Sequence, residues 1–184
     1  MRGWSHAARW GRWCWWLERA ADKPASVVDR AAVATVFDKL NLRHIDEIVV
    51  VDAPGSFEPA LAALAGVQVL RSPAQVERLH FALAFVKRQA DLDRITPELI
   101  ARAEGDALLW FAYPKKSSRR SRSEIDRDKG WALLGAAGYE PVRIVAIDED
   151  WSALRYRRVE HIASFERDPA RALSAAGRKR AQDR

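Results

Sequence analysis

Residues 105–118 read GDALLWFAYPKKSS, and this stretch decides the fold. A turn at Gly105 and Asp106 leads into seven mainly apolar residues, which end at a proline followed by two lysines. A continuous apolar run bounded by turn residues is typical of a strand buried on both faces of a parallel sheet. Ligands of open α/β folds bind where such strands end, so residues 114–118 are the first place to look for a site.

Short apolar runs alternate with helix-like stretches through the rest of the domain. Strands are expected at residues 48–51, 67–70, 81–86, 107–112, 142–147 and 153–159. Helical starts are expected at Ser56, at Ser72-Pro73-Ala74-Gln75, at Thr96-Pro97-Glu98 and near Trp131, the last helix closing at Gly138. The final two strands are too close in sequence for a parallel crossover. The pattern predicts a Rossmann-like, mostly parallel sheet with helices on both faces, closing in an antiparallel hairpin.

Three segments are expected. Residues 36–162 form the α/β domain. Residues 1–35 are rich in Trp and Arg without a clean amphipathic pattern, which predicts disorder or translation from upstream of the true start at Val33 or Val36. A membrane or partner anchor is the alternative for this leader. Residues 163–184 mix Ala with Arg and Lys, as in a basic tail that is helical or disordered.

Composition narrows the class of protein. The 184 residues carry a net charge of +6, and the excess lies in residues 1–35, 115–129 and 155–184. Such segments can bind nucleic acid or anionic membranes, although solvated tails are more common. The single Cys14 excludes an internal disulfide, and the four histidines lack metal-ligand spacing, so no metal is expected. No apolar run is long enough for a transmembrane segment, which favours a cytoplasmic location.

The order of elements resembles the Rossmann-like methyltransferase fold, which ends in a helix, a strand and a final antiparallel strand. Three motifs are more specific: YPKKSS at 113–118, GY at 138–139 and DWS at 150–152. Through them, residues 36–160 resemble a bacterial domain family of unknown function. The resemblance implies the fold and implies no particular activity.

The cofactor signature of methyltransferases is missing. Adenosylmethionine is held by a Gly-x-Gly loop after the first strand and by an acid that ends the second strand. Here the first expected strand is followed by DAPGS at 52–56, with a single glycine, and the second by Arg71 and Ser72. We therefore expect no adenosylmethionine and no other cofactor.

Candidate ligand-binding residues follow the fourth strand. Lys115, Lys116, Ser117 and Ser118 offer two ammonium groups and two hydroxyls, which suit a phosphate or carboxylate. A solvated loop is the alternative for these four residues. It is the favoured interpretation of the arginines at 119, 120 and 122.

Three further candidates lie at expected strand ends. Asp52 and Asp148 could work as acid and base, although an aspartate at a strand end more often caps a turn. Trp151 is expected to pack the hairpin onto the sheet, and a stacking platform for a ring is the alternative.

Together these observations predict a cytoplasmic α/β domain that is non-catalytic or binds a small anionic ligand at the carboxyl edge of the strands. A divergent methyltransferase-like or other transferase is the first alternative. A nucleic-acid-associated basic protein is the second, although the chain has no basic motif interleaved with aromatic residues.

Overall fold

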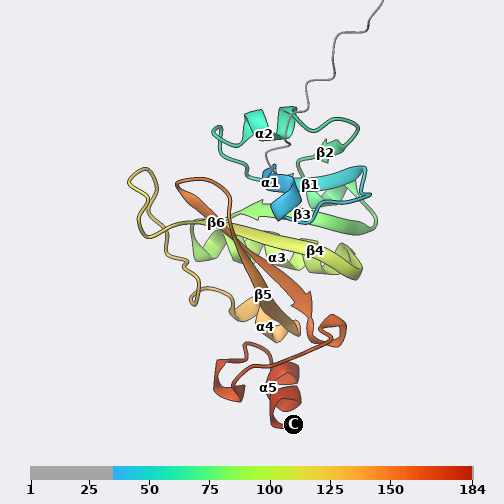
Figure 1. The fold of residues 1–184 in the computed structure, drawn as a ribbon, viewed down its shortest axis with the longest axis vertical. Helices are drawn as coiled ribbons and strands as arrows, with labels where there is room; N and C mark the ends of the chain where they lie inside the picture. The colour runs from blue at the N-terminus through green and yellow to red at the C-terminus, as the bar shows by residue number, and fades with distance from the viewer. Residues whose placement is uncertain (1–34, 184) are drawn as a thin grey trace, which may run out of the picture. The chain divides into compact units, whose positions relative to one another are not determined.

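A six-stranded sheet organises the chain in the computed structural model, which describes residues 35–183. The predictions made for the tryptophan-rich leader lie outside these residues. The strands are β1 (Glu47–Val51), β2 (Gln68–Leu70), β3 (Leu79–Phe85), β4 (Ala103–Pro114), β5 (Tyr139–Ala146) and β6 (Trp151–Arg158). Their order is β2-β1-β3-β4-β6-β5 (Figure 1). The first four are parallel and β6 is antiparallel to both its neighbours, which confirms the predicted fold class.

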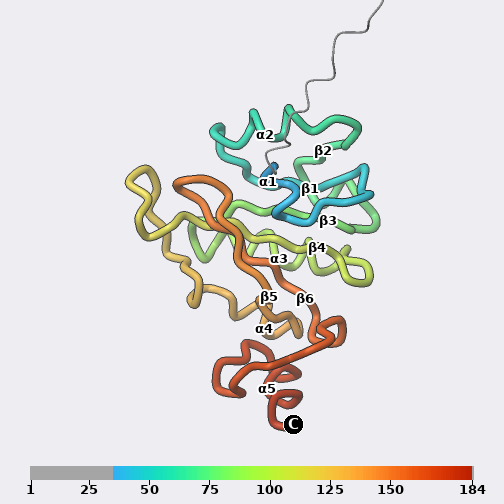
Figure 2. The backbone as a smooth tube through the Cα atoms, in the orientation of Figure 1, coloured from blue at the N-terminus to red at the C-terminus, as the bar shows by residue number. Residues whose placement is uncertain are grey.

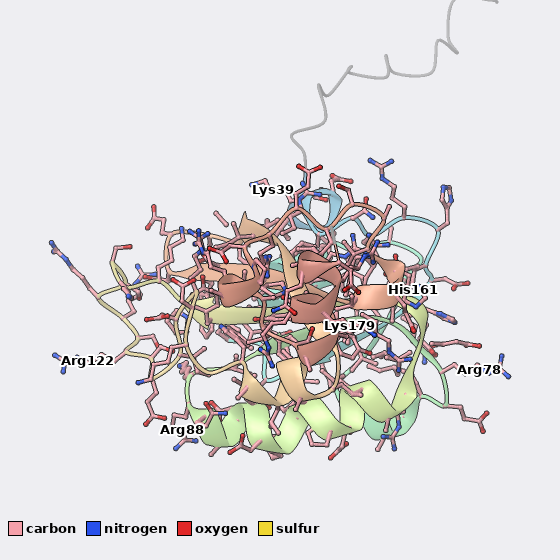
Figure 3. The ribbon with its side chains drawn as sticks, turned by 90° about the horizontal axis from the view of Figure 1, so that it is seen from below. Lys39, Arg78, Arg88, Arg122, His161 and Lys179 are labelled. Atoms are coloured by element: carbon pink, nitrogen blue, oxygen red, sulfur yellow. The ribbon has the colours of Figure 1, made fainter. Side chains whose placement is uncertain are left out.

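Helices cover both faces of this sheet. They are α1 (Val36–Lys39), α2 (Glu58–Ala62), α3 (Gln89–Arg102), α4 (Ala132–Ala136) and α5 (Ala175–Gln182), with short 3₁₀ turns η1 (Pro73–Gln75), η2 (Val159–His161) and η3 (Pro169–Arg171). One apolar cluster joins the sheet to α3 and α4, and the other joins it to α1 and α2. Figure 3 shows α3 on one side of the sheet and Lys39, in α1, on the other. No helix in residues 35–183 combines the length and the apolar character needed to cross a membrane.

Residues 105–114 form most of β4, one of the two central strands of the sheet. Every residue of β4 from Ala107 to Pro114 is buried. Leu109 and Phe111 belong to the cluster on the α3 face, whereas Leu108 belongs to the opposite cluster. Burial on both faces explains why this strand is apolar throughout and lacks the alternation of a half-exposed strand.

The start of α3 differs from the prediction. The helix begins at Gln89, seven residues before Thr96, and Pro97 lies inside it. The signal is Asp91, whose carboxylate accepts hydrogen bonds from the N–H groups of Lys87 and Arg88 at 2.9 Å each. No Ser or Thr caps the start of α3, and the Asp91 carboxylate accepts from the N–H groups there instead. A search for a Ser or Thr N-cap therefore places the start of the helix too late.

Two of the three other predicted starts, at Ser56 and Ser72, lead into short elements, and the third is confirmed by α4, whose N-cap is Trp131. Phe57 is the N-cap of α2 and makes no side-chain capping bond, so Ser56 does not cap this helix. The capping box from Ser72 to Gln75 is confirmed, but it encloses only the 3₁₀ turn η1.

The Asp91 cap makes stability depend on pH. Burial raises the pKa of Asp91, but the hydrogen bonds from Lys87 and Arg88 outweigh it and hold the pKa below its usual value. The stabilisation is therefore present above the unfolded pKa of about 4 and is lost as the pH falls through the folded pKa. We expect Asp91→Asn to lower the free energy of unfolding at pH 7 by about 1 kcal/mol. The deficit should shrink towards pH 3 in thermal unfolding. Asp93→Asn is the control, and an equal deficit for Asp91→Asn at both pH values would contradict the assignment.

The C-terminal segment is held by one buried carboxylate. Glu140 in β5 is 0% exposed and accepts a hydrogen bond from the Arg167 guanidinium at 2.8 Å. It also accepts from the N–H groups of Leu173 (3.1 Å) and Ser174 (2.6 Å) and from the Ser174 hydroxyl (2.7 Å). Ser174 in turn caps α5 through the N–H of Gly177. The segment predicted to be helical or disordered thus contains a helix anchored to the sheet edge.

Candidate anion-binding site

Three connections meet at the carboxyl end of the central strands. The β4–α4 loop (residues 115–131) runs beside the turn between β5 and β6 (Figure 2). The N–H of Lys115 donates to the carbonyl of Asp150 in that turn at 2.7 Å. On its other side, the hydroxyl of Ser123 donates to the carbonyl of Lys87, after β3, at 3.0 Å. The loop is therefore tied to both neighbouring connections.

The two predicted lysines have different environments. The Lys115 ammonium donates to the carbonyl of Asp148 at 2.7 Å, so it holds the β5–β6 turn. Lys116 is 84% exposed and pairs with Asp126 at 3.0 Å. A hydrogen bond from the N–H of Asp128 and the neighbouring Lys116 ammonium hold the pKa of Asp126 below its usual value. An anion that binds Lys116 has to compete with an ionised carboxylate.

Ser118 organises the loop. Its hydroxyl donates to Asp150 at 2.8 Å and accepts from the N–H groups of Arg120 and Ser121 at 3.3 Å each. Arg120 also pairs with Asp150 at 3.4 Å. Ser117, in contrast, is exposed. These bonds shape the loop before any ligand arrives.

The two predicted aspartates lie apart. Asp52 follows β1 in a left-handed conformation (φ 54°) and pairs with Arg94 of α3. Asp148 accepts hydrogen bonds from the N–H groups of Asp150 (2.8 Å) and Trp151 (2.7 Å), as expected of a turn cap. β3 and β4 lie between β1 and the β5–β6 hairpin that carries Asp148, so the two aspartates are on separate parts of the sheet edge. The structure does not bring these two carboxylates together.

Trp151 lies in the core at the same end of the sheet. It is 4% exposed and packs edge-on against Phe85, with 5.0 Å between ring centroids. The Lys87 ammonium lies 5.6 Å from the centre of the Trp151 ring. With Phe85 on one side and Lys87 close by, little of this ring is open to a ligand.

The β4–α4 loop encloses a hollow of about 460 Å³. Its lining combines four basic residues, three serines and two acids: Lys115, Lys116, Arg122, Lys129, Ser118, Ser121, Ser123, Glu124 and Asp126. Within residues 35–183, Arg122 and Lys129 have no carboxylate within 4 Å. Figure 3 shows Arg122 at the outer end of the loop. Sequence reasoning missed Lys129, because only the folding of the loop brings it beside Lys116.

The residue that follows β2 is basic. Arg71 follows β2 directly and makes two hydrogen bonds, at 3.0 and 2.7 Å, to Glu58 in the first turn of α2. A guanidinium paired with a carboxylate has no acceptor to offer a ribose hydroxyl.

In the described part of the chain, no three His, Cys, Asp or Glu side chains are grouped as metal ligands.

No protein-family model matches the sequence, and no curated protein does. Among solved structures, a chain from Sulfolobus solfataricus named as a putative type 11 methyltransferase is similar, with 10% sequence identity and a TM-score of 0.40. The match covers 65% of this chain and 88% of that chain. A likeness at this level does not bear on the chemistry of the loops.

Proposed function

We propose that this protein binds a small phosphorylated or carboxylated molecule in the hollow of the β4–α4 loop. The observation that carries the proposal is the lining of this hollow, where four basic side chains outnumber two carboxylates. Arg122 and Lys129 have no carboxylate within 4 Å in the described residues, so they can bind an anion without breaking an ion pair. Phosphate and carboxylate groups are the preferred partners of guanidinium and ammonium groups.

The size and rigidity of the loop support a small ligand. A hollow of about 460 Å³ lies within the range of small-molecule sites. The bonds that Lys115 and Ser118 make to the β5–β6 turn hold the loop in shape, which reduces the entropy lost on binding. In this proposal Lys115 positions the loop, whereas Lys116, Arg122 and Lys129 contact the ligand.

The nucleic-acid alternative has less support from the basic tail. Arg178 donates to the carbonyls of Ala172 and Leu173, and Arg180 donates to those of Val159 and Ala163. These guanidinium groups stabilise the C-terminal segment, so they are not a free surface for phosphates.

Calorimetric titration with pyrophosphate tests the proposal. We expect the wild-type chain to bind with a dissociation constant below about 1 mM. The double change Lys116→Gln and Lys129→Gln should weaken pyrophosphate binding in the loop at least about tenfold, because it removes two charge-assisted contacts. The indole N–H signal of Trp131, which donates to the carbonyl of Asp126 in this loop, reports the loop binding specifically. The matched control, Lys39→Gln with Arg43→Gln, removes the same charge from an exposed place remote in sequence and should change binding less than about twofold.

Two results would overturn the proposal. One is the absence of pyrophosphate binding by the wild-type chain at millimolar concentration. The other is an equal loss in the lysine variant and its control, which would indicate diffuse electrostatic attraction. Adenosylmethionine is titrated in parallel, and tight binding of this molecule that the lysine variant retains would favour the methyltransferase-like alternative.

A further inference from the structure

Three arginines share one face of the sheet, away from the β4–α4 loop. Arg155 lies opposite Trp110 of β4 and opposite Arg143 of β5, and residues opposite each other on neighbouring strands point to the same face. Arg157, two residues along β6, points the same way. This is the face that α1 and α2 cover elsewhere, but β6 and β5 lie at the other end of the sheet order (Figure 1).

Asp106 is the carboxylate that pairs with the arginine cluster (Arg143, Arg155 and Arg157). Asp106 accepts from Nε and Nη2 of Arg157 at 2.7 and 2.5 Å, so both of its oxygens are used. Arg155 is left with a contact of 3.5 Å to the same carboxylate. In residues 35–183 Arg143 has no carboxylate within 4 Å. The cluster therefore has two positive charges in excess.

This excess charge is partly buried. The Arg155 side chain is 15% exposed, and its Nε–H has no acceptor among the described residues. The indole N–H of Trp110, on the neighbouring strand, also lacks one there. Burial lowers the pKa of Arg155, and Arg157 and Arg143 act in the same direction against Asp106. A guanidinium with unused donors and like-charged neighbours destabilises the fold unless an anion is added.

We propose that the arginine cluster binds the phosphate group of a small molecule, at a site separate from the β4–α4 loop. Neighbouring strands are about 4.8 Å apart, and alternate residues of one strand are about 6.6 Å apart. Three guanidinium groups at this spacing can converge on one phosphate or diphosphate. One guanidinium group can donate two parallel hydrogen bonds to a phosphate group, which suits this geometry.

A compact phosphate fits these observations better than a nucleic-acid strand. Proteins that bind single-stranded nucleic acid use a long basic groove with exposed aromatic rings that stack on the bases. Here the cluster spans two strands, and the nearby aromatic ring, Trp110, is 0% exposed.

Indole N–H signals in proton–nitrogen correlation spectra of the full chain separate the two proposed sites. Trp110 reports on the arginine cluster, being opposite Arg155. Trp131 reports on the β4–α4 loop, because its indole N–H donates to the carbonyl of Asp126 at 2.9 Å. Trp110→Phe and Trp131→Phe assign the signals. We expect pyrophosphate to shift the Trp110 signal in a saturable way, and to do so equally when Lys116 and Lys129 are both Gln.

Arg143→Gln should weaken the Trp110 response at least about tenfold. Arg143 is exposed, so this variant is expected to fold. Arg171→Gln, which also removes one exposed positive charge, is the matched control and should have little effect.

A Trp110 signal that stays unmoved at about 10 mM pyrophosphate would overturn the inference, since that concentration exceeds a millimolar dissociation constant. Equal weakening by Arg143→Gln and Arg171→Gln would also overturn it. Single-stranded DNA of about 12 nucleotides moving the Trp110 signal at far lower concentration than pyrophosphate would replace the small molecule with a nucleic acid. A Trp131 response lost in the lysine variant while the Trp110 response persists separates the two proposals, whereas no pyrophosphate binding by the wild-type chain would overturn both.

Discussion

Replacing Glu140 by Ala is expected to lower the free energy of unfolding by about 3–5 kcal/mol. The change leaves the partly buried Arg167 guanidinium beside the Pro141 carbonyl without its carboxylate. It also removes the acceptor for the N–H groups of Leu173 and Ser174 and for the Ser174 hydroxyl. Each buried donor left without a partner destabilises the folded state, and this substitution leaves several such donors without one.

Chemical denaturation and amide hydrogen exchange measure this effect. Exchange should accelerate most in α5, because that helix reaches the sheet through Glu140 and Ser174. Glu149→Ala, an exposed change in the β5–β6 turn, is the control. Gly177→Ala approaches the same contact from the other side, since a Cβ there would lie 2.3 Å from the Glu140 carboxylate. If Glu140→Ala and Glu149→Ala were equally stable, the anchoring role would be wrong.

Replacing Trp131 by Ala should lower the free energy of unfolding by about 3–5 kcal/mol. Trp131 contacts the rings of Phe111, Tyr113 and Tyr156, with centroids 6.0, 5.9 and 5.3 Å away. Its removal leaves a cavity between the sheet and α4. It also removes the indole bond to the carbonyl of Asp126, which ties the β4–α4 loop to the core.

Trp131→Phe separates these two contributions. The smaller ring keeps most of the aromatic packing and loses the hydrogen bond. We expect it to retain more than half of the stability lost in Trp131→Ala, and to weaken pyrophosphate binding in the loop by loosening it. Denaturation curves and calorimetry give both quantities. A Trp131→Ala variant as stable as the wild type would show that the aromatic cluster does not hold this side of the sheet.

Much of the basic charge is used inside the fold. Arg157 pairs with Asp106, Arg167 with Glu140, and Arg180 binds two carbonyls. The net charge of +6 therefore does not by itself indicate a nucleic-acid partner. Arg122, Lys129 and Arg143 are among the described cations that have no carboxylate within 4 Å.

The sequence could have revealed the arginine cluster in part. Arg155 and Arg157 are two residues apart in a predicted strand, and period 2 places them on one face. Arg143 and Asp106 join them only through the register of β5 and β4 with β6. That register pairs residues many positions apart in the chain, which local patterns do not encode.

The sequence by itself determined the strands, their alternation with helices and the closing hairpin. These features depend on local periodicity and on the short distance between β5 and β6, which residue patterns report directly. Tertiary structure alone decided that Lys115 supports a turn while Lys129 lines the hollow, and that Glu140 anchors α5. Whether a lysine or glutamate side chain is solvated, paired or buried depends on which distant segment of the chain lies beside it. Burial and pairing, and with them the role of a charged residue, arise only when the chain is folded.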